Sequence, residues 1–122
     1  MSYLSADEIL SADDLQREPV AVPEWGGTVL VQGMTGTERD KFEASMLNSK
    51  GDRMDKDKAM ERYRARLCAA CIVDENGKRL FQGDAVVRRL GEKSAQALTR
   101  VAEVAARLSG LSDDDVEELT GN

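Results

Sequence analysis

The sequence of 122 residues contains no histidine, and this absence removes several kinds of chemistry. Ser-His-Asp and Cys-His triads need an imidazole as their base, and many metal sites need one as a ligand. No apolar run approaches the roughly 18 residues that span a bilayer, and the N-terminus has neither a basic region nor a hydrophobic signal core. We therefore expect a cytoplasmic protein that works without histidine.

Cysteine is almost as scarce, with Cys68 and Cys71 as the two residues of this type. They are too few and too close in sequence for the disulfide framework of a secreted domain. Their C-x-x-C spacing is used by redox dithiols and by half of a four-cysteine zinc site. A redox pair gains its low pKa at the start of a helix, whereas these residues fall late in a predicted helix, and a zinc site needs a second pair. Burial on an apolar stripe explains them better, so we predict no cofactor.

Other candidate sites for chemistry are equally incomplete. The acidic run at residues 113–118 lacks the alternating acids and the glycine of a calcium loop, and helix capping accounts for it better. Residues 33–36 lack the lysine and the spacing of a phosphate-binding loop. A catalytic pair of carboxylates would need a pocket and a raised pKa, which a sequence does not show. We therefore predict no catalytic, cofactor-binding or metal-binding residues, and we expect a protein that is not an enzyme.

The net charge of −6 is distributed unevenly along the chain. Residues 1–24 carry six acids and one base, and residues 109–122 carry five acids and no base, whereas residues 50–66 carry seven bases against four acids. Acidic ends repel phosphate, so we expect no binding to nucleic acid, and the lack of an apolar span predicts none to membranes. Attraction between acidic ends and basic middle would favour a homo-oligomer, and solvated charged faces are the alternative.

The length of 122 residues predicts a single domain over residues 1–122, with short acidic arms at 1–18 and 111–122. Its predicted fold class is α+β, mainly helical, with a small N-terminal β-hairpin packed on a helical bundle. β-branched residues on either side of Gly26 and Gly27 predict the hairpin, because glycines can take the positive φ angles of a tight turn. Two prolines lack amide hydrogens and place the first strand at a sheet edge.

Capping boxes, apolar stripes and glycine stops predict the helices of the remaining chain. These helices cover, approximately, residues 6–10, 36–47, 57–73, 85–90 and 93–108. Asp84 is predicted to cap the fourth of them, and Gly110 to stop the fifth. The polar segment 48–55 is predicted to be a disordered loop. Ser112 and Asp115 form a capping pair that predicts a short final helix, which we interpret as a docking helix.

Apolar residues near the turns and the C-terminal arm are the candidates for partner binding. Trp25 either covers the base of the hairpin or anchors a partner. Met34 is a flexible apolar residue suited to an adaptable surface, and gap filling in a core is the alternative. Leu111 lies on the C-terminal arm, where Val116 and Leu119 form a small apolar edge. We predict that these five side chains bind partners.

Three segments carry an order of elements that points to a known family. They are residues 22–40, which hold the hairpin turn and the start of the next helix, residues 73–81, and the run at 90–112. Together they closely resemble the tail assembly chaperones of long flexible-tailed bacteriophages. The likeness covers nearly the whole chain and consists of patterns of fold and turn, so it indicates a family without marking a site.

The resemblance implies a protein that acts early in phage tail assembly, in the host cytoplasm, and is absent from the finished virion. Such a chaperone coats the long, helical tape measure protein, keeps it soluble, and recruits the tail tube protein that displaces it. Many relatives are also made as a longer product by a programmed ribosomal frameshift, and this chain would be the shorter product. The alternatives are a minor phage structural or connector protein and an acidic regulator that binds a basic host protein.

Overall fold

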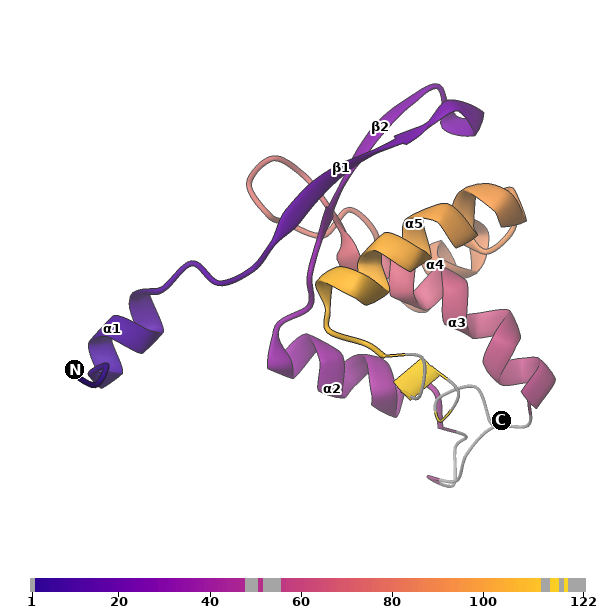
Figure 1. The fold of residues 1–122 in the computed structure, drawn as a ribbon. Coiled ribbons are helices and arrows are strands. Elements are labelled where there is room, and N and C mark those ends of the chain that lie inside the picture. The colour runs from indigo at the N-terminus through magenta and orange to yellow at the C-terminus, as the bar shows by residue number, and fades with distance from the viewer. Residues whose placement is uncertain (1, 48–50, 52–55, 113–114, 117, 119–122) are drawn as a thin grey trace.

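The computed structural model describes residues 2–47, 51, 56–112, 115–116 and 118. Their elements, in chain order, are α1 (Ala6–Ser11), β1 (Arg17–Val22), the 3₁₀ turn η1 (Pro23–Trp25), β2 (Gly27–Gln32), α2 (Gly36–Ala44), α3 (Lys56–Cys71), β3 (Ile72–Val73), α4 (Asp84–Leu90) and α5 (Ala95–Leu108). The β1–β2 hairpin packs on the helices (Figure 1), which confirms the predicted α+β class.

The hairpin forms an antiparallel ladder that runs from Arg17 opposite Gln32 to Val22 opposite Gly27. At its tip, Gly26 has a φ of 76°, in the left-handed region that a residue without a Cβ enters at little steric cost. Gly27 already belongs to β2, so one glycine of the predicted pair supplies the positive φ. The strand order is β1-β2-β3, which places β1 at the edge, as Pro19 within it and Pro23 directly after it predict.

A short third strand is the main difference from the predicted elements. The apolar spacing predicts a helix to residue 73, but α3 ends at Cys71 and Ile72–Val73 pairs with β2. Both residues of β3 are β-branched and buried, and the sheet gives their backbone groups hydrogen-bond partners. Val73 also forms a single bridge with Arg79, across the turn at 74–78 that joins β3 to the rest of the chain.

Two of the caps predicted at helix starts are present, and a third is not. The capping boxes before α1 and α2 are both present. At α2, Thr35 Oγ1 accepts a hydrogen bond from Glu38 N–H (3.1 Å), and the Glu38 carboxylate accepts one from Thr35 N–H (2.8 Å). The predicted cap by Asp84 is wrong, because Gly83 occupies the N-cap of α4. Asp84 lies in the first turn, where its charge still complements the helix dipole.

Helix α5 packs against α3 and against both long strands, so it lies at the centre of the core (Figure 1). It begins two residues later than predicted, because Ser94 Oγ accepts a hydrogen bond from Ala97 N–H (3.3 Å) and fixes the N-cap. Gly110, with a φ of 73°, follows its end as predicted. At Gly33 the chain passes so close to α5 that a Cβ would overlap the carbonyl oxygen of Leu108.

Some predictions fall on residues that are not described. The disordered loop predicted at 48–55 lies outside the described residues except for residue 51, and so does Leu119. The predicted N-terminal arm at 1–18 ends inside the sheet, since β1 begins at Arg17. In the described part of the chain, no helix is long and apolar enough to cross a membrane.

Candidate functional site

An apolar pocket of about 700 Å³ opens beside the tip of the hairpin, which we call the Trp25 pocket. Its apolar lining consists of Trp25, Phe81, Val86 and Leu90. Its charged lining consists of Glu24, Arg89, Glu92 and Lys93. The pocket is thus built where η1, the segment before α4, and α4 with its following turn meet, and its volume falls within the range of about 300–1,000 Å³ usual for binding pockets.

The apolar lining has a fixed base and an accessible wall. Leu90 is buried in the core, and Trp25 and Phe81 are half-buried against it. Val86 remains 38% exposed, so a partner can reach it. The Trp25 indole N–H is buried and has no acceptor among the residues described. A buried donor without an acceptor is unfavourable, so the described contacts leave the hydrogen-bonding capacity of Trp25 unused.

An ion pair holds the hairpin tip over the helices. Arg100 on α5 donates two hydrogen bonds to the Glu24 carboxylate, with Nη1–Oε1 at 2.7 Å and Nη2–Oε2 at 3.0 Å. These bonds lower the pKa of Glu24 to about 2, so the carboxylate is charged at neutral pH. Two parallel bonds also fix the relative orientation of the two groups. The wall of the pocket that contains Glu24 and Trp25 is therefore positioned before any partner binds.

The predicted partner-binding residues do not gather at one site. Trp25 lines the pocket, but Met34 and Leu111 are buried, with 8% and 9% of their surfaces exposed. Val116 is half-buried and packs against the same core. For Met34 the burial agrees with the alternative of filling a gap in the core. Neither Met34 nor Leu111 therefore offers an exposed side chain to a partner in this structure.

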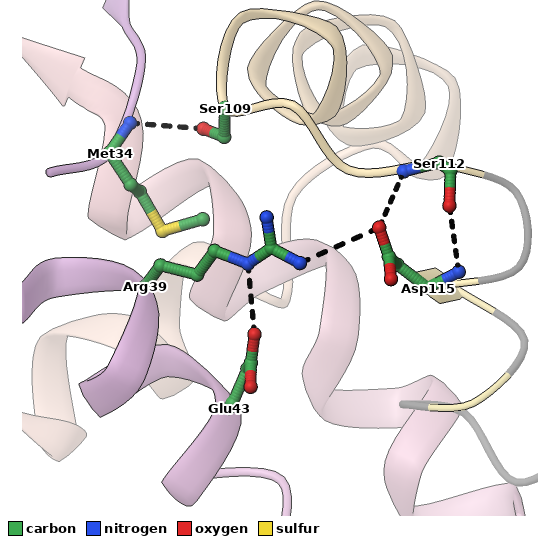
Figure 2. Close-up of polar contacts among 6 residues, drawn as sticks. All are labelled: Met34, Arg39, Glu43, Ser109, Ser112 and Asp115. Carbon is green, nitrogen blue, oxygen red and sulfur yellow. Dashed lines mark hydrogen bonds and ion pairs between the residues drawn. The ribbon is translucent and has the colours of Figure 1, made fainter. Parts of the chain in front are cut away.

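The C-terminal segment attaches to α2 through Arg39, as Figure 2 shows. Arg39 donates from Nε to Glu43 Oε1 (2.9 Å), and its Nη2 lies 3.5 Å from Asp115 Oδ2. Asp115 accepts a hydrogen bond from Ser112 N–H (3.0 Å), and Ser112 Oγ accepts one from Asp115 N–H (3.1 Å). The predicted capping pair is confirmed. The surface on which this segment docks belongs to its own chain.

The two cysteines lie in the core, with Cys68 beside the first turn of α5 and Cys71 beside its end. Cys68 Sγ donates to Leu98 O (3.5 Å), and Cys71 Sγ lies 3.7 Å from Ser109 Oγ, which also accepts a hydrogen bond from Met34 N–H (3.0 Å; Figure 2). Burial raises the pKa of Cys68 to about 12 and that of Cys71 to about 11. Both thiols are therefore protonated at neutral pH, and their burial on an apolar stripe is confirmed.

The N-terminal arm exposes apolar side chains that are not among the partner-binding residues predicted from the sequence. Tyr3, Leu4, Ile9 and Leu10 expose 92, 70, 57 and 83% of their surfaces. Helix α1 has no buried residue and projects away from the rest of the molecule (Figure 1). The signal that could have identified them is the presence of four large apolar residues on a segment too short to form a core of its own.

Neither metal chemistry nor relatives assign a role to these surfaces. Within the described ranges, no group of three or more acidic or cysteine side chains is placed to hold a metal ion. Comparison of the chain with protein-family profiles, curated proteins and solved structures finds no match. The features that bear on function are therefore the Trp25 pocket, the exposed N-terminal arm and the charge of the molecule.

Proposed function

We propose that the protein is a tail assembly chaperone of a long flexible-tailed bacteriophage, which binds apolar helical faces of the tape measure protein at the Trp25 pocket and keeps that protein soluble in the host cytoplasm. The observation that carries the proposal is an accessible apolar pocket on a small acidic protein. The hairpin tip that supplies Trp25 also falls within residues 22–40, the first segment of the family resemblance.

The pocket suits an amphipathic helix. Such a helix binds through apolar side chains at positions i, i+3 or i+4, and i+7, which enter a groove lined by apolar residues. Trp25 and Phe81 supply aromatic surface, the type enriched among residues that dominate binding energy. Because the Glu24–Arg100 pair already fixes the hairpin tip, little ordering is required when the helix binds.

The charge of the molecule suits the second part of the role, which is solubility. The chain has a net charge of −6, and charged side chains surround the pocket. A copy bound over an apolar helical face of the tape measure protein would replace that face with charged surface. Tape measure proteins coated in this way would repel one another because they carry charge of the same sign. The proposal further includes later recruitment of the tail tube protein, absence from the mature virion, and a longer product made by frameshifting.

The test is co-expression with the tape measure protein encoded beside it, measuring the fraction of tape measure protein that stays soluble. The test variant is Val86→Glu, which places a charge at the accessible wall of the pocket. The matched control is Leu80→Glu, since Leu80 is 54% exposed and does not line the pocket. We expect the wild type and Leu80→Glu to keep the tape measure protein soluble, and Val86→Glu to fail while remaining folded by circular dichroism.

Other outcomes would favour the alternatives. Equal solubility of the tape measure protein with and without this chain would contradict the proposal. Finding the chain in purified virions would favour a structural or connector protein. Salt-sensitive capture of a basic host protein, with no effect on the tape measure protein, would favour an acidic regulator.

A further inference from the structure

The N-terminal arm, residues 2–16, presents apolar surface that the described part of the chain leaves largely uncovered. Four of its five large apolar side chains, those of Tyr3, Leu4, Ile9 and Leu10, are each more than half exposed, and α1 has no buried residue. A helix of six residues is only marginally stable in water when nothing packs against it. Apolar residues gathered on an unattached helix therefore point to a partner surface that receives them.

We infer that α1 of one copy docks into the Trp25 pocket of a second copy, so that the chain associates with itself head to tail. The pocket supplies the complementary apolar surface, with Val86 accessible and Phe81 half-buried. The inference concerns the protein alone and goes beyond the proposed role in binding a tape measure protein.

The position of the arm favours a second copy over its own chain. The arm leaves the hairpin at Arg17, opposite Gln32, whereas the pocket lies at the other end, beyond the pairing of Val22 with Gly27. Figure 1 shows α1 directed away from the hairpin tip. The five-residue linker at 12–16 spans at most about 17 Å, and the six residues of β1 already cover about 20 Å. A return to its own pocket would need a fully extended linker and a reversal at Arg17.

Charge complementarity supports the same contact. The arm carries four acids, at positions 7, 8, 13 and 14, and no base. The pocket rim carries Arg89 and Lys93, and among the described residues none of the ion pairs involves either of them. The rim acid Glu24 is already paired with Arg100, which leaves Glu92 as the opposing charge. An acidic arm entering this pocket therefore meets more positive than negative free charge.

The contact has a defined symmetry. Arm and pocket are different surfaces, so the contact is not self-complementary, and repeating it produces a ring or an open chain of copies. The average mass of the protein therefore rises with concentration unless a closed ring forms at once. If the proposed function also holds, α1 and a helix of the tape measure protein compete for one pocket. Binding of the tape measure protein then separates the copies.

The test measures the average mass of the 122-residue chain, without tape measure protein, by sedimentation velocity over a series of concentrations. Leu10→Glu removes apolar surface from the arm, Val86→Glu blocks the pocket, and Leu80→Glu is the matched control outside both surfaces. We expect the average mass of the wild type and the control to rise at least about twofold above the monomer. Each of the other two variants stays monomeric alone.

Mixing the two blocked variants makes the test specific. The Leu10→Glu copy retains an intact pocket and the Val86→Glu copy retains an intact arm, so an equimolar mixture forms a heterodimer and nothing larger. A wild type that stays monomeric, or a mixture that does not associate, overturns the inference. If Val86→Glu abolishes solubilisation of the tape measure protein in a chain that is always monomeric, the proposed function stands and the self-docking falls. If Leu10→Glu also failed to keep the tape measure protein soluble, the arm would be assigned to binding of the tape measure protein.

Discussion

Two short helical segments, one near each end of the chain, begin with the same exchange of hydrogen bonds. Ser5 and Glu8 exchange two of them, at 3.0 and 3.2 Å, and Ser112 and Asp115 exchange two, at 3.0 and 3.1 Å. The C-terminal segment is attached to the body, whereas α1 touches none of the core. A capping box thus sets where a helix begins and does not determine what the helix packs against.

The difference between the two ends comes from burial. Leu111 is 9% exposed and Val116 packs against the core, whereas Tyr3, Leu4, Ile9 and Leu10 of the N-terminal arm are each more than half exposed. Burying one leucine stabilises a fold by about 1.5–3 kcal/mol, which is more than the roughly 1 kcal/mol of a typical N-cap. Leu111 and Val116 are thus used for folding, whereas the four exposed side chains of the N-terminal arm remain free to bind another molecule.

The largest expected effect is a difference in the free energy of unfolding between two leucine variants, one at each end of the chain. Leu111→Ala should lower the free energy of unfolding by about 2–5 kcal/mol, because it leaves a cavity beside the core. Leu10→Ala should change it by less than about 0.5 kcal/mol, because Leu10 is 83% exposed. Urea unfolding measured by circular dichroism at low protein concentration gives both values. Equal losses in the two variants would show that the arm packs on the body.

A second prediction concerns Gly33, where the chain passes close to the end of α5, just before the C-terminal segment. Gly33→Ala should destabilise the fold by about 1–3 kcal/mol, because the added Cβ would meet the backbone carbonyl of Leu108, which cannot move without shifting α5. Gly36→Ala is the matched control, since a Cβ there has no neighbour within 4 Å and lies in the first turn of α2. The control should be neutral or slightly stabilising in the same unfolding assay. Equal effects would contradict the close approach.

The features that sequence alone could predict are those set by neighbouring residues. The hairpin, both N-terminal capping boxes and the apolar stripe of α5 depend on spacing within a few residues, and they are present. Ile72–Val73 becomes a strand because β2, some forty residues earlier, offers it an edge. No local pattern contains that information.

The candidate site shows the same limit. Trp25 could be selected as an unusual residue, but Phe81 and Val86 line its pocket only because α4 folds against the hairpin tip. Leu111 and Leu10 have the same side chain on two acidic arms, and local spacing does not show that one is buried. Tertiary packing decides which apolar residues remain accessible. The sequence therefore led to Leu111, which is buried, as a partner-binding residue and not to Leu10, which is exposed.

A third prediction compares the two serine caps. Ser112→Ala should cost about 0.5–2 kcal/mol of global stability, because the segment it begins packs on α2 and the core. Ser5→Ala removes an equivalent bond from α1, but α1 can unfold while the core stays intact, so the global unfolding free energy should not change. Hydrogen exchange should show loss of protection at Glu8 N–H in the second variant. A global loss in Ser5→Ala would contradict an independent arm.

The smallest expected effect is a difference in pH dependence between the two capping carboxylates. Hydrogen bonds from Ser112 hold the pKa of Asp115 below its ordinary value of 3.8, with Arg39 adding to the shift, and hydrogen bonds from Ser5 hold the pKa of Glu8 below 4.5. A lowered pKa in the folded state gives stability that is present above the ordinary pKa and is lost as the pH falls below it. For Asp115 this stability belongs to the whole fold, and for Glu8 it belongs to α1 alone.

The two carboxylates can be separated by unfolding Asp115→Asn and Glu8→Gln at about pH 7 and at about pH 3, on either side of these ordinary values. The wild type and Glu8→Gln should lose the same stability on acidification, and Asp115→Asn should lose less, because one of the linked groups no longer titrates. The Glu24–Arg100 pair contributes the same background to all three proteins, since neither substitution touches it. If Glu8→Gln flattened the pH dependence as much as Asp115→Asn, α1 would have to be coupled to the core, and the arm would not be free to enter another copy.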